Sequence, residues 1–253
     1  MKHARVAYAG AIHDAVEAHG GLRLSDGRVV DEQAVVWLPP LEAGTIFALG
    51  LNYADHAKEL SFKTPPEPLV FLKAPQTLCG HLGHSVRPHG VTYMHYECEL
   101  AVVIGRTARH VDRADAFRYV GGYTIANDYA IRDYLENYYR PNLRVKSRDS
   151  ATPLGPWLVD ASDIADPMNL RLRTLVNGRV TQEGCTRDMI FDIPALISYL
   201  SSFMTLESGD LILTGTPEGL ADVKAGDEVV TEIEGIGQLK NTIIGPSENS
   251  NVG

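Results

Sequence analysis

Glycine and proline interrupt this chain so often that only short secondary-structure elements fit between them. The 253 residues include 23 glycines and 14 prolines, which mark turns and end helices. Most apolar runs between them have the length and composition of β-strands. The pattern predicts a mainly β (α+β) fold with a few short helices, because the regular strand–helix alternation of a Rossmann fold or TIM barrel is missing.

The apolar runs predict the positions of the elements. We expect strands at 45–49, 69–72, 96–104, 121–127, 170–176, 210–213, 228–233 and 238–243, and helices at 53–60, 112–119, 131–139 and 194–204. Asn52 and Asp192 are candidate N-caps, and Asn177-Gly178 is a β-hairpin signal.

The chain divides into three expected parts. Residues 1–43 form a small N-terminal β region, 44–245 the main domain and 246–253 a frayed tail. Pro39-Pro40 marks the first boundary. The alternative is that the N-terminal region adds a sheet layer to a single domain.

The net charge of the chain restricts which kinds of molecule it is expected to bind. Lysine and arginine number 23 against 32 aspartates and glutamates, which gives a net charge of −9. This argues against nucleic acid or an anionic membrane as the main partner. No apolar run reaches the ~18 residues of a transmembrane helix, and the start of the chain has no signal-peptide pattern. The three cysteines form no C-x-x-C pair, so we expect a cytoplasmic protein in a reducing compartment.

The run YECELAVVI at 96–104 is the most informative about chemistry. Alternate side chains of a strand share a face, so Glu97 and Glu99 point the same way with Cα atoms about 6–7 Å apart. Val103 shares that face, whereas Cys98 belongs to the opposite, apolar face. Two carboxylates on a partly buried face repel each other unless a cation such as Mg²⁺, Mn²⁺ or Ca²⁺ neutralises them. The alternative is a hydrated pair on an edge strand.

A third carboxylate, Asp128, ends the apolar run at 121–127. An acid at a strand end can converge with acids on a neighbouring strand. Three carboxylates would leave about three octahedral positions of a metal ion for water or a chelating substrate. Taken alone, Asp128 is better explained as the cap of the following helix.

Three further groups of residues are candidates for catalysis or binding. His56 and Glu59 are three residues apart on an expected helix, where a carboxylate beside an imidazole can form a general base; a surface ion pair is the alternative. Lys146 and Arg148 belong to a charged run that could equally be a solvated turn. The LTGTPEG run at 213–219 is no phosphate loop. Its backbone or hydroxyls could contact a ligand, or it could be a plain turn.

Together these runs resemble the fumarylacetoacetate hydrolase superfamily over about residues 44–245. The segments stand in the family's order: GLNYADHAKE at 50–59, FLKAP at 71–75, YECE at 96–99, Asn127-Asp128, Lys146 and TGTP at 214–217. The resemblance implies a layered β-roll, usually dimeric. The runs at 93–97 and 128–149 are most similar to the branch that isomerises and decarboxylates intermediates of aromatic catabolism. That branch contains a fused tandem, of which this chain would supply one copy beside a paralogous subunit or a second identical chain.

The resemblance also implies roles for individual residues. Glu97, Glu99 and Asp128 would hold a divalent metal, with Mg²⁺ preferred over Mn²⁺ or Ca²⁺. His56, Glu59 and Lys146 would be catalytic. Substrate contacts would come from Tyr53, Arg132, Arg148, Gly215 and Thr216. Many relatives have an aromatic residue near Arg148, and an arginine there suits a substrate with an additional carboxylate.

The implied substrates are small anionic α-keto acids. The expected reactions are decarboxylation of 5-oxopent-3-ene-1,2,5-tricarboxylate and isomerisation of 2-hydroxyhepta-2,4-diene-1,7-dioate in 4-hydroxyphenylacetate catabolism. Both would use a dienolate stabilised by the metal and by Lys146. In the isomerisation, His56 would move a proton to or from the distal carbon. The alternatives are a C–C hydrolase of the acylpyruvate or fumarylacetoacetate type, an oxaloacetate decarboxylase, and an inactive structural subunit of a heteromer.

Overall fold

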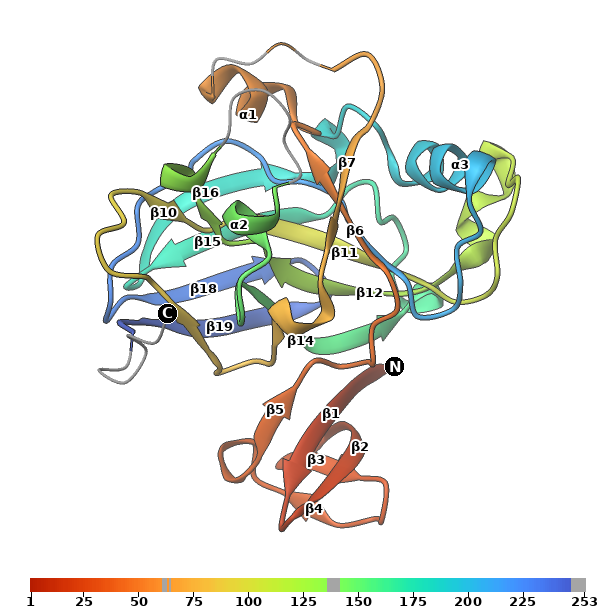
Figure 1. Cartoon of the computed structure of the whole chain (residues 1–253). Helices are drawn as coiled ribbons and strands as arrows, with labels where there is room; N and C mark the ends of the chain where they lie inside the picture. The colour runs from red at the N-terminus through yellow and green to blue at the C-terminus, as the bar shows by residue number, and fades with distance from the viewer. Residues whose placement is uncertain (61–62, 64, 136–141, 247–253) are drawn as a thin grey trace.

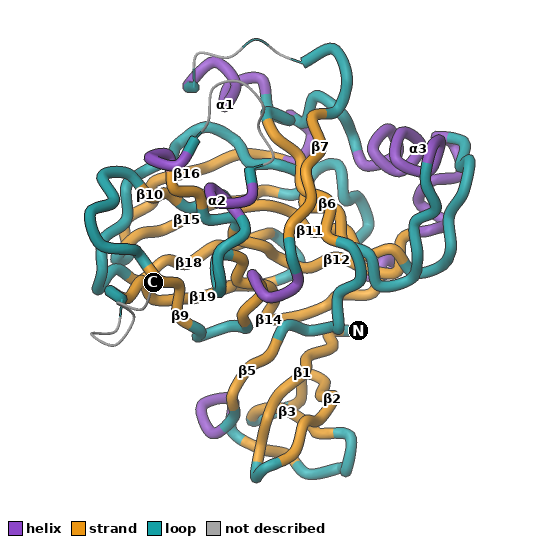
Figure 2. Tube along the Cα trace, in the orientation of Figure 1, coloured by secondary structure: helices purple, strands orange, loops and turns teal. Residues whose placement is uncertain are grey.

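A computed structural model describes residues 1–60, 63, 65–135 and 142–246 of the chain. Strands dominate it, and the helices are few and short (Figures 1 and 2). The mainly β fold expected from the sequence is therefore confirmed. No helix in the described ranges is long and apolar enough to cross a membrane.

A twelve-stranded sheet forms the body of the described structure. Its main path runs β4-β3-β2-β1-β14-β12-β11-β17-β6-β7, with β5 paired to β1 and β8 to β14. The strands are β1 (Lys2–Tyr8), β2 (Ala11–Ala18), β3 (Gly21–Leu24), β4 (Val29–Val30), β5 (Val36–Leu38), β6 (Ile46–Gly50), β7 (Leu69–Lys73), β8 (Leu78–Cys79), β11 (Cys98–Ile104), β12 (Val120–Asn127), β14 (Thr152–Asp160) and β17 (Leu211–Leu213).

Two smaller sheets complete the β structure. The five-stranded sheet has the order β16-β15-β18-β19-β9. Its strands are β9 (His84–Val86), β15 (Arg171–Val176), β16 (Arg179–Cys185), β18 (Glu228–Ile233) and β19 (Gly237–Ile244). A two-stranded ribbon joins β10 (Met94–His95) to β13 (Ala130–Ile131).

The helices lie outside the sheets. The α-helices are α1 (Ala54–Glu59), α2 (Leu143–Lys146) and α3 (Ile193–Phe203), and 3₁₀ turns span Glu32–Ala34, Pro75–Thr77, Arg113–Tyr119, Arg132–Tyr134, Ala161–Asp163 and Thr186–Asp188. Helix α3 packs against Arg113–Tyr119, away from α1 and α2 (Figure 1). Asp192 caps α3 as expected, since its carboxylate accepts a hydrogen bond from the Ala195 N–H at 2.8 Å.

Strand β11 is buried on both faces. Cys98, Leu100 and Val102 belong to the main hydrophobic core, which also includes residues of the five-stranded sheet and of α3. Ala101 and Val103 pack on the other face with residues of β6, β14 and β17. The face that bears Glu99 is therefore an interior face, as the sequence pattern predicted.

The N-terminal strands β1–β5 project from one end of the molecule (Figure 1). They are not separated from the large sheet, because β1 pairs with β14 through Lys2↔Val159 and His3↔Leu158. Ala4 and Val6 also belong to the main core. A domain boundary near residue 43 stays a prediction.

Several local predictions are confirmed and others are wrong. Asn177-Gly178 joins β15 to β16 with positive φ at both residues, the geometry of a type I′ hairpin. The helix expected at 112–119 is a 3₁₀ helix, Arg113–Tyr119.

The helix expected at 131–139 is replaced by a strand and a 3₁₀ turn in its described part, because the pairing Met94↔Ile131 recruits the backbone into β13. Residues 136–139 of that expected helix lie outside the described residues, as does the expected tail beyond residue 246.

Candidate active site

Three carboxylates meet where β11 begins and β12 ends. Antiparallel pairing of Cys98 with Asn127 brings Glu97 and Asp128 together from segments about thirty positions apart in the chain. One oxygen of each of Glu97, Glu99 and Asp128 lies within 4.8 Å of the others, and all three side chains are buried. The three residues that sequence reasoning selected as metal ligands are therefore brought together.

Two buried lysines accompany these acids. Lys146 Nζ, at the end of α2, donates to Asp128 Oδ2 at 2.8 Å and to Glu97 Oε2 at 2.5 Å. Lys73 Nζ, at the end of β7, donates to Asp128 Oδ1 at 2.6 Å and also to the Lys146 carbonyl oxygen. Burial favours neutral Lys146, but Asp128, Glu97 and Glu99 outweigh it and raise its pKa. The three carboxylates outnumber the two lysines, and the next cation, Arg132, has a terminal nitrogen 3.7 Å from Glu97 Oε1.

The hydrogen bonding of Glu99 indicates whether these residues fit a metal ion. Its Oε2 accepts a hydrogen bond from the Gly215 N–H at 2.7 Å, whereas its buried Oε1 has no partner among the described residues. Burial, followed by repulsion from Asp128 and Glu97, raises the pKa of Glu99 well above its ordinary value. A buried polar atom without a partner is costly. A divalent cation with oxygen ligands would satisfy this atom, so the residues present fit such an ion.

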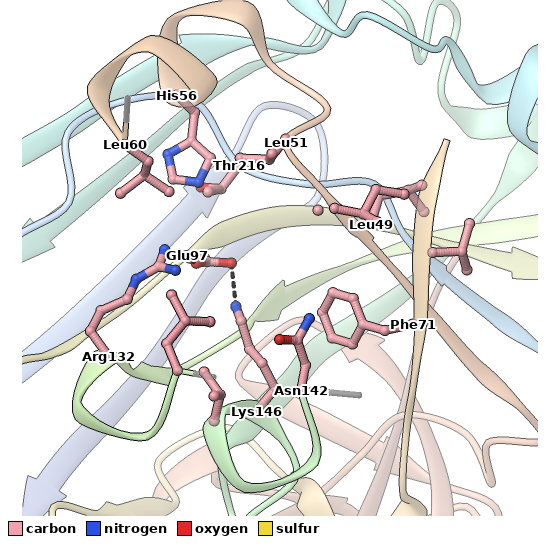
Figure 3. Close-up of a pocket in the computed structure, with 15 residues that line it drawn as sticks. Leu49, Leu51, His56, Leu60, Phe71, Glu97, Arg132, Asn142, Lys146 and Thr216 are labelled. Carbon is pink, nitrogen blue, oxygen red and sulfur yellow. Dashed lines mark hydrogen bonds and ion pairs between the residues drawn. The ribbon is translucent and has the colours of Figure 1, made fainter. Parts of the chain in front are cut away.

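A cavity of about 130 Å³ opens beside the carboxylates (Figure 3). Its polar lining is Glu97, Lys146, Arg132, His56, Asn142 and Thr216. Its apolar lining is Leu49, Leu51, Leu60, Leu69, Val70, Phe71, Leu135 and Val145. Cationic groups beside an apolar wall suit a small anion with a carbon chain.

A buried His56 and a partly exposed Glu59 form an anchored pair at this cavity. His56 Nδ1 lies 3.2 Å from Glu59 Oε2, and the His56 side chain is only 5% exposed. Glu59 Oε1 accepts hydrogen bonds from the Gly219 and Leu220 N–H groups, both at 3.1 Å. The imidazole is therefore not on the surface, although its partner Glu59 is partly exposed. Glu59 fixes the imidazole and also ties α1 to the loop that follows β17.

Asn52 does not cap α1. That helix has Tyr53 at its N-cap position, without a side-chain cap. The Asn52 amide instead donates to the Thr214 carbonyl at 2.8 Å and to the Phe191 carbonyl at 3.0 Å. It thus joins the start of α1 to the turn at Gly215. Gly215 has φ +89°, and a Cβ there would lie 2.9 Å from the Asn52 Cβ, so glycine is required.

Three of the expected substrate contacts do not line the cavity. Tyr53 is fully buried in the main core. Gly215 donates its N–H to Glu99. Arg148 has its guanidinium carbon 5.9 Å from the centre of the Tyr134 ring. Arg132 and Thr216 do line the cavity, so the arginine beside it is Arg132 and not Arg148. Another arginine nearby in the sequence, Arg140, lies outside the described residues.

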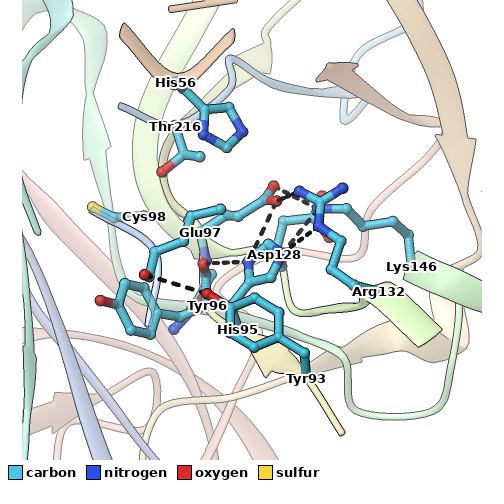
Figure 4. Close-up of polar contacts among 12 residues, drawn as sticks. His56, Tyr93, His95, Tyr96, Glu97, Cys98, Asp128, Arg132, Lys146 and Thr216 are labelled. Carbon is cyan, nitrogen blue, oxygen red and sulfur yellow. Dashed lines mark hydrogen bonds and ion pairs between the residues drawn. The ribbon is translucent and has the colours of Figure 1, made fainter. Parts of the chain in front are cut away.

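Sequence reasoning missed two functional candidates, Lys73 and His95. Lys73 was noted only within the FLKAP run, although a lysine that ends an apolar strand is a detectable signal. His95 is completely buried beneath Arg132, whose Nε donates to His95 Nε2 at 2.8 Å (Figure 4). Burial, then repulsion by Arg132 and Lys146, lowers the pKa of His95 well below its ordinary value. No local pattern predicts that pairing.

Replacement of Lys73 tests the buried charge network. Lys73→Met keeps the chain length but leaves the Asp128 carboxylate with one cation fewer. Removal of one partner of a buried pair costs about 3–5 kcal/mol of unfolding free energy, to be measured by urea denaturation with saturating Mg²⁺. The control is Arg118→Met, which breaks the exposed pair with Asp115 and should cost less than about 1 kcal/mol. Equal losses in both variants would contradict the assignment.

Comparison with protein families identifies the family of this chain. Residues 45–244 match the family described as Fumarylacetoacetate (FAA) hydrolase C-terminal. The chain belongs to the fumarylacetoacetate hydrolase family. The resemblance inferred from the motifs is thereby confirmed, and the match covers nearly the whole segment on which those motifs lie.

Individual members of the fumarylacetoacetate hydrolase family are similar to this chain. The 4-hydroxyphenylacetate degradation bifunctional isomerase/decarboxylase of Salmonella dublin is 66% identical over 213 residues, which are 84% of this chain and 49% of that protein. The chain spans about half the length of this relative and of the bifunctional isomerase/decarboxylases of Escherichia coli that it also matches.

Solved structures of family members share the fold. The crystal structure of 5-carboxymethyl-2-hydroxymuconate delta-isomerase from Mycobacterium smegmatis has a TM-score of 0.86 and 36% identity, covering 98% of this chain and all of that one. The maleylpyruvate hydrolase of Sphingobium sp. SYK-6, crystallised with manganese(II) and pyruvate, has a TM-score of 0.82 and 26% identity, covering 98% of this chain and all of that one.

Proposed function

We propose that this chain decarboxylates 5-oxopent-3-ene-1,2,5-tricarboxylate and isomerises 2-hydroxyhepta-2,4-diene-1,7-dioate in 4-hydroxyphenylacetate catabolism. The observation that supports this best is the buried cluster of three carboxylates and two lysines that borders a cavity with His56 and Arg132 on its wall. The names of the relatives from Salmonella dublin and Mycobacterium smegmatis support the same chemistry.

Glu97, Glu99 and Asp128 would hold the divalent cation, and we propose Mg²⁺. When bound, such an ion supplies Lewis-acid polarisation of the α-keto acid end of the substrate. The choice rests on the all-oxygen donor set, which suits Mg²⁺, Mn²⁺ and Ca²⁺ alike, and on the abundance of Mg²⁺ in a cytoplasm. The Mn²⁺ in the Sphingobium hydrolase crystal supports a divalent ion in general.

Lys146 would act where negative charge develops. Loss of CO₂ breaks the bond to one carboxylate, and the electron pair moves through the alkene toward the keto oxygen. Lys146 Nζ lies at the cavity wall between Glu97 and Asp128. Its fixed positive charge would stabilise that oxygen in a site largely closed to water.

His56 would move the proton. With Nδ1 held by Glu59, its Nε2 would accept a proton from one carbon of the diene and return it to another. Glu59 keeps the imidazole oriented and would stabilise it when it is protonated. Arg132 would hold the remote carboxylate, with Thr216 on the facing wall.

The test is incubation of the purified chain and Mg²⁺ with the tricarboxylate, while CO₂ release and the diene absorbance are followed. Stoichiometric CO₂ and a transient diene are expected. Release of a carboxylic-acid fragment in place of CO₂ would contradict the proposal and indicate a C–C hydrolase instead. Absence of any reaction by the metal-loaded chain would support the inactive-subunit alternative.

We propose in addition that two copies of the domain assemble, as two identical chains or with a paralogous subunit. The support is that this chain spans about half of its bifunctional relatives. Light scattering of the purified chain should give twice its 27.6 kDa mass. A chain that is monomeric alone and dimerises only with a paralogue would support the heteromer. A fully active monomer would contradict both the homodimer and the heteromer.

A further inference from the structure

Arg132 is held at the cavity by an unusual partner. Its Nε donates to His95 Nε2 at 2.8 Å, and one of its terminal nitrogens lies 3.7 Å from Glu97 Oε1. The Arg132 side chain is 22% exposed and lines the cavity, whereas His95 is completely buried behind it (Figure 4). The nearest Glu97 oxygen is farther than a hydrogen bond, so the imidazole is the group that sets the guanidinium's orientation.

The hydrogen bonds define which nitrogen of His95 bears the proton. Its Nδ1 lies 3.0 Å from the carbonyl oxygen of Tyr96. A carbonyl can only accept and a guanidinium can only donate. His95 must therefore have its hydrogen on Nδ1 and present the lone pair of Nε2 to Arg132.

A neutral acceptor such as His95 affects the charge of Arg132 differently from a carboxylate. A carboxylate at this position would orient the arginine but would also cancel its charge. The imidazole occupies only the Nε–H and adds no negative charge, and the carboxylate of Glu97 lies beyond hydrogen-bond distance, at 3.7 Å. Both terminal nitrogens of Arg132 then remain available for a second planar anion.

The backbone fixes the two residues relative to each other. His95 on β10 pairs with Ala130 on β13, two residues before Arg132. The Arg132 N–H donates to the Tyr93 carbonyl at 3.0 Å. His95 therefore extends from this short ribbon and Arg132 from the residue that directly follows it, so their separation is set before any ligand arrives.

We propose that His95 is a positioning residue that orients Arg132 to bind the substrate carboxylate remote from the keto acid end. This rests on the proposed function, because it assumes a substrate with a second carboxylate. His95 does not line the cavity, and it would determine substrate specificity through the side chain of Arg132.

The test compares two unreactive ligands that differ only in the remote carboxylate, 2-oxoheptanedioate and 2-oxoheptanoate. Calorimetry with the Mg²⁺-loaded protein gives their dissociation constants. His95→Leu should weaken binding of the dioate by about tenfold, the scale of one charge-assisted hydrogen bond. Binding of the monoacid should change less than twofold. His95→Gln, which can place an acceptor near the Nε2 position, should restore most of the dioate affinity.

A double-mutant cycle separates this role from a merely structural one. If His95 acts through Arg132, His95→Leu should have no further effect on dioate binding in an Arg132→Gln background. Equal weakening of both ligands, or additive effects in the double variant, would overturn the proposal. Because these are binding measurements, they remain valid if the chain turns over neither proposed substrate. If His95→Leu fails to fold, the proposal is decided by whether His95→Gln retains the preference for the dioate and Arg132→Gln loses it.

Discussion

Removal of divalent cations with a chelator is expected to abolish turnover and to lower the melting temperature, and Mg²⁺ or Mn²⁺ should restore both. The reason is the crowding of charge at the site, where three buried carboxylates repel one another although Lys73 and Lys146 bind them and Arg132 lies near Glu97. An ion present at about 100 times its dissociation constant stabilises the folded state by roughly 2.7 kcal/mol. Calorimetric titration of the apo-protein with Mn²⁺ should give one site per chain.

Glu99→Gln sharpens this prediction because Glu99 Oε1 has no partner of its own among the described residues. The substitution replaces a carboxyl whose charged form is disfavoured by burial and by repulsion from Asp128 and Glu97, so the metal-free variant should be at least as stable as metal-free wild type. Its stabilisation by Mn²⁺ should be lost. The control is Glu228→Gln at an exposed position, which should keep the full metal response. A Glu99→Gln protein that binds Mn²⁺ as tightly as wild type would remove Glu99 from the ligand set.

His56→Ala is expected to slow isomerisation by about 10²–10⁴-fold, the usual contribution of a general base. Decarboxylation and Mn²⁺ affinity should change much less, because the imidazole is not among the buried carboxylates. The measurement is the rate of diene loss, together with incorporation of solvent deuterium into the product. An isomerisation rate equal to that of the wild type would show that His56 is not the general base and has only a structural role.

Two substitutions of Glu59 separate its two contacts. A glutamine can still accept the Gly219 and Leu220 N–H groups but loses the charge that supports a protonated His56. Glu59→Gln should therefore slow isomerisation and keep the melting temperature. Glu59→Ala should lower both, since α1 loses its connection to the 219–220 loop. If the two variants melt alike, that connection has no role in stability.

The sequence alone determined the features that depend on neighbouring residues. Strand alternation placed Glu97 and Glu99 on one face, helical spacing placed His56 beside Glu59, and turn chemistry located the hairpin at Asn177-Gly178. These follow from backbone periodicity and φ preferences, which act over a few residues.

The tertiary structure decided which residues, distant in the sequence, lie beside these locally placed side chains. Lys73 reaches Asp128 across 55 positions, Glu59 reaches Gly219 across 160, and Asn52 binds Thr214 instead of capping its own helix. Arg132 rather than Arg148 borders the cavity because pairing of β10 with β13 replaced the expected helix. Such contacts depend on sheet register and on the burial of unpaired charge, which are properties of the assembled fold and not of any local run of residues.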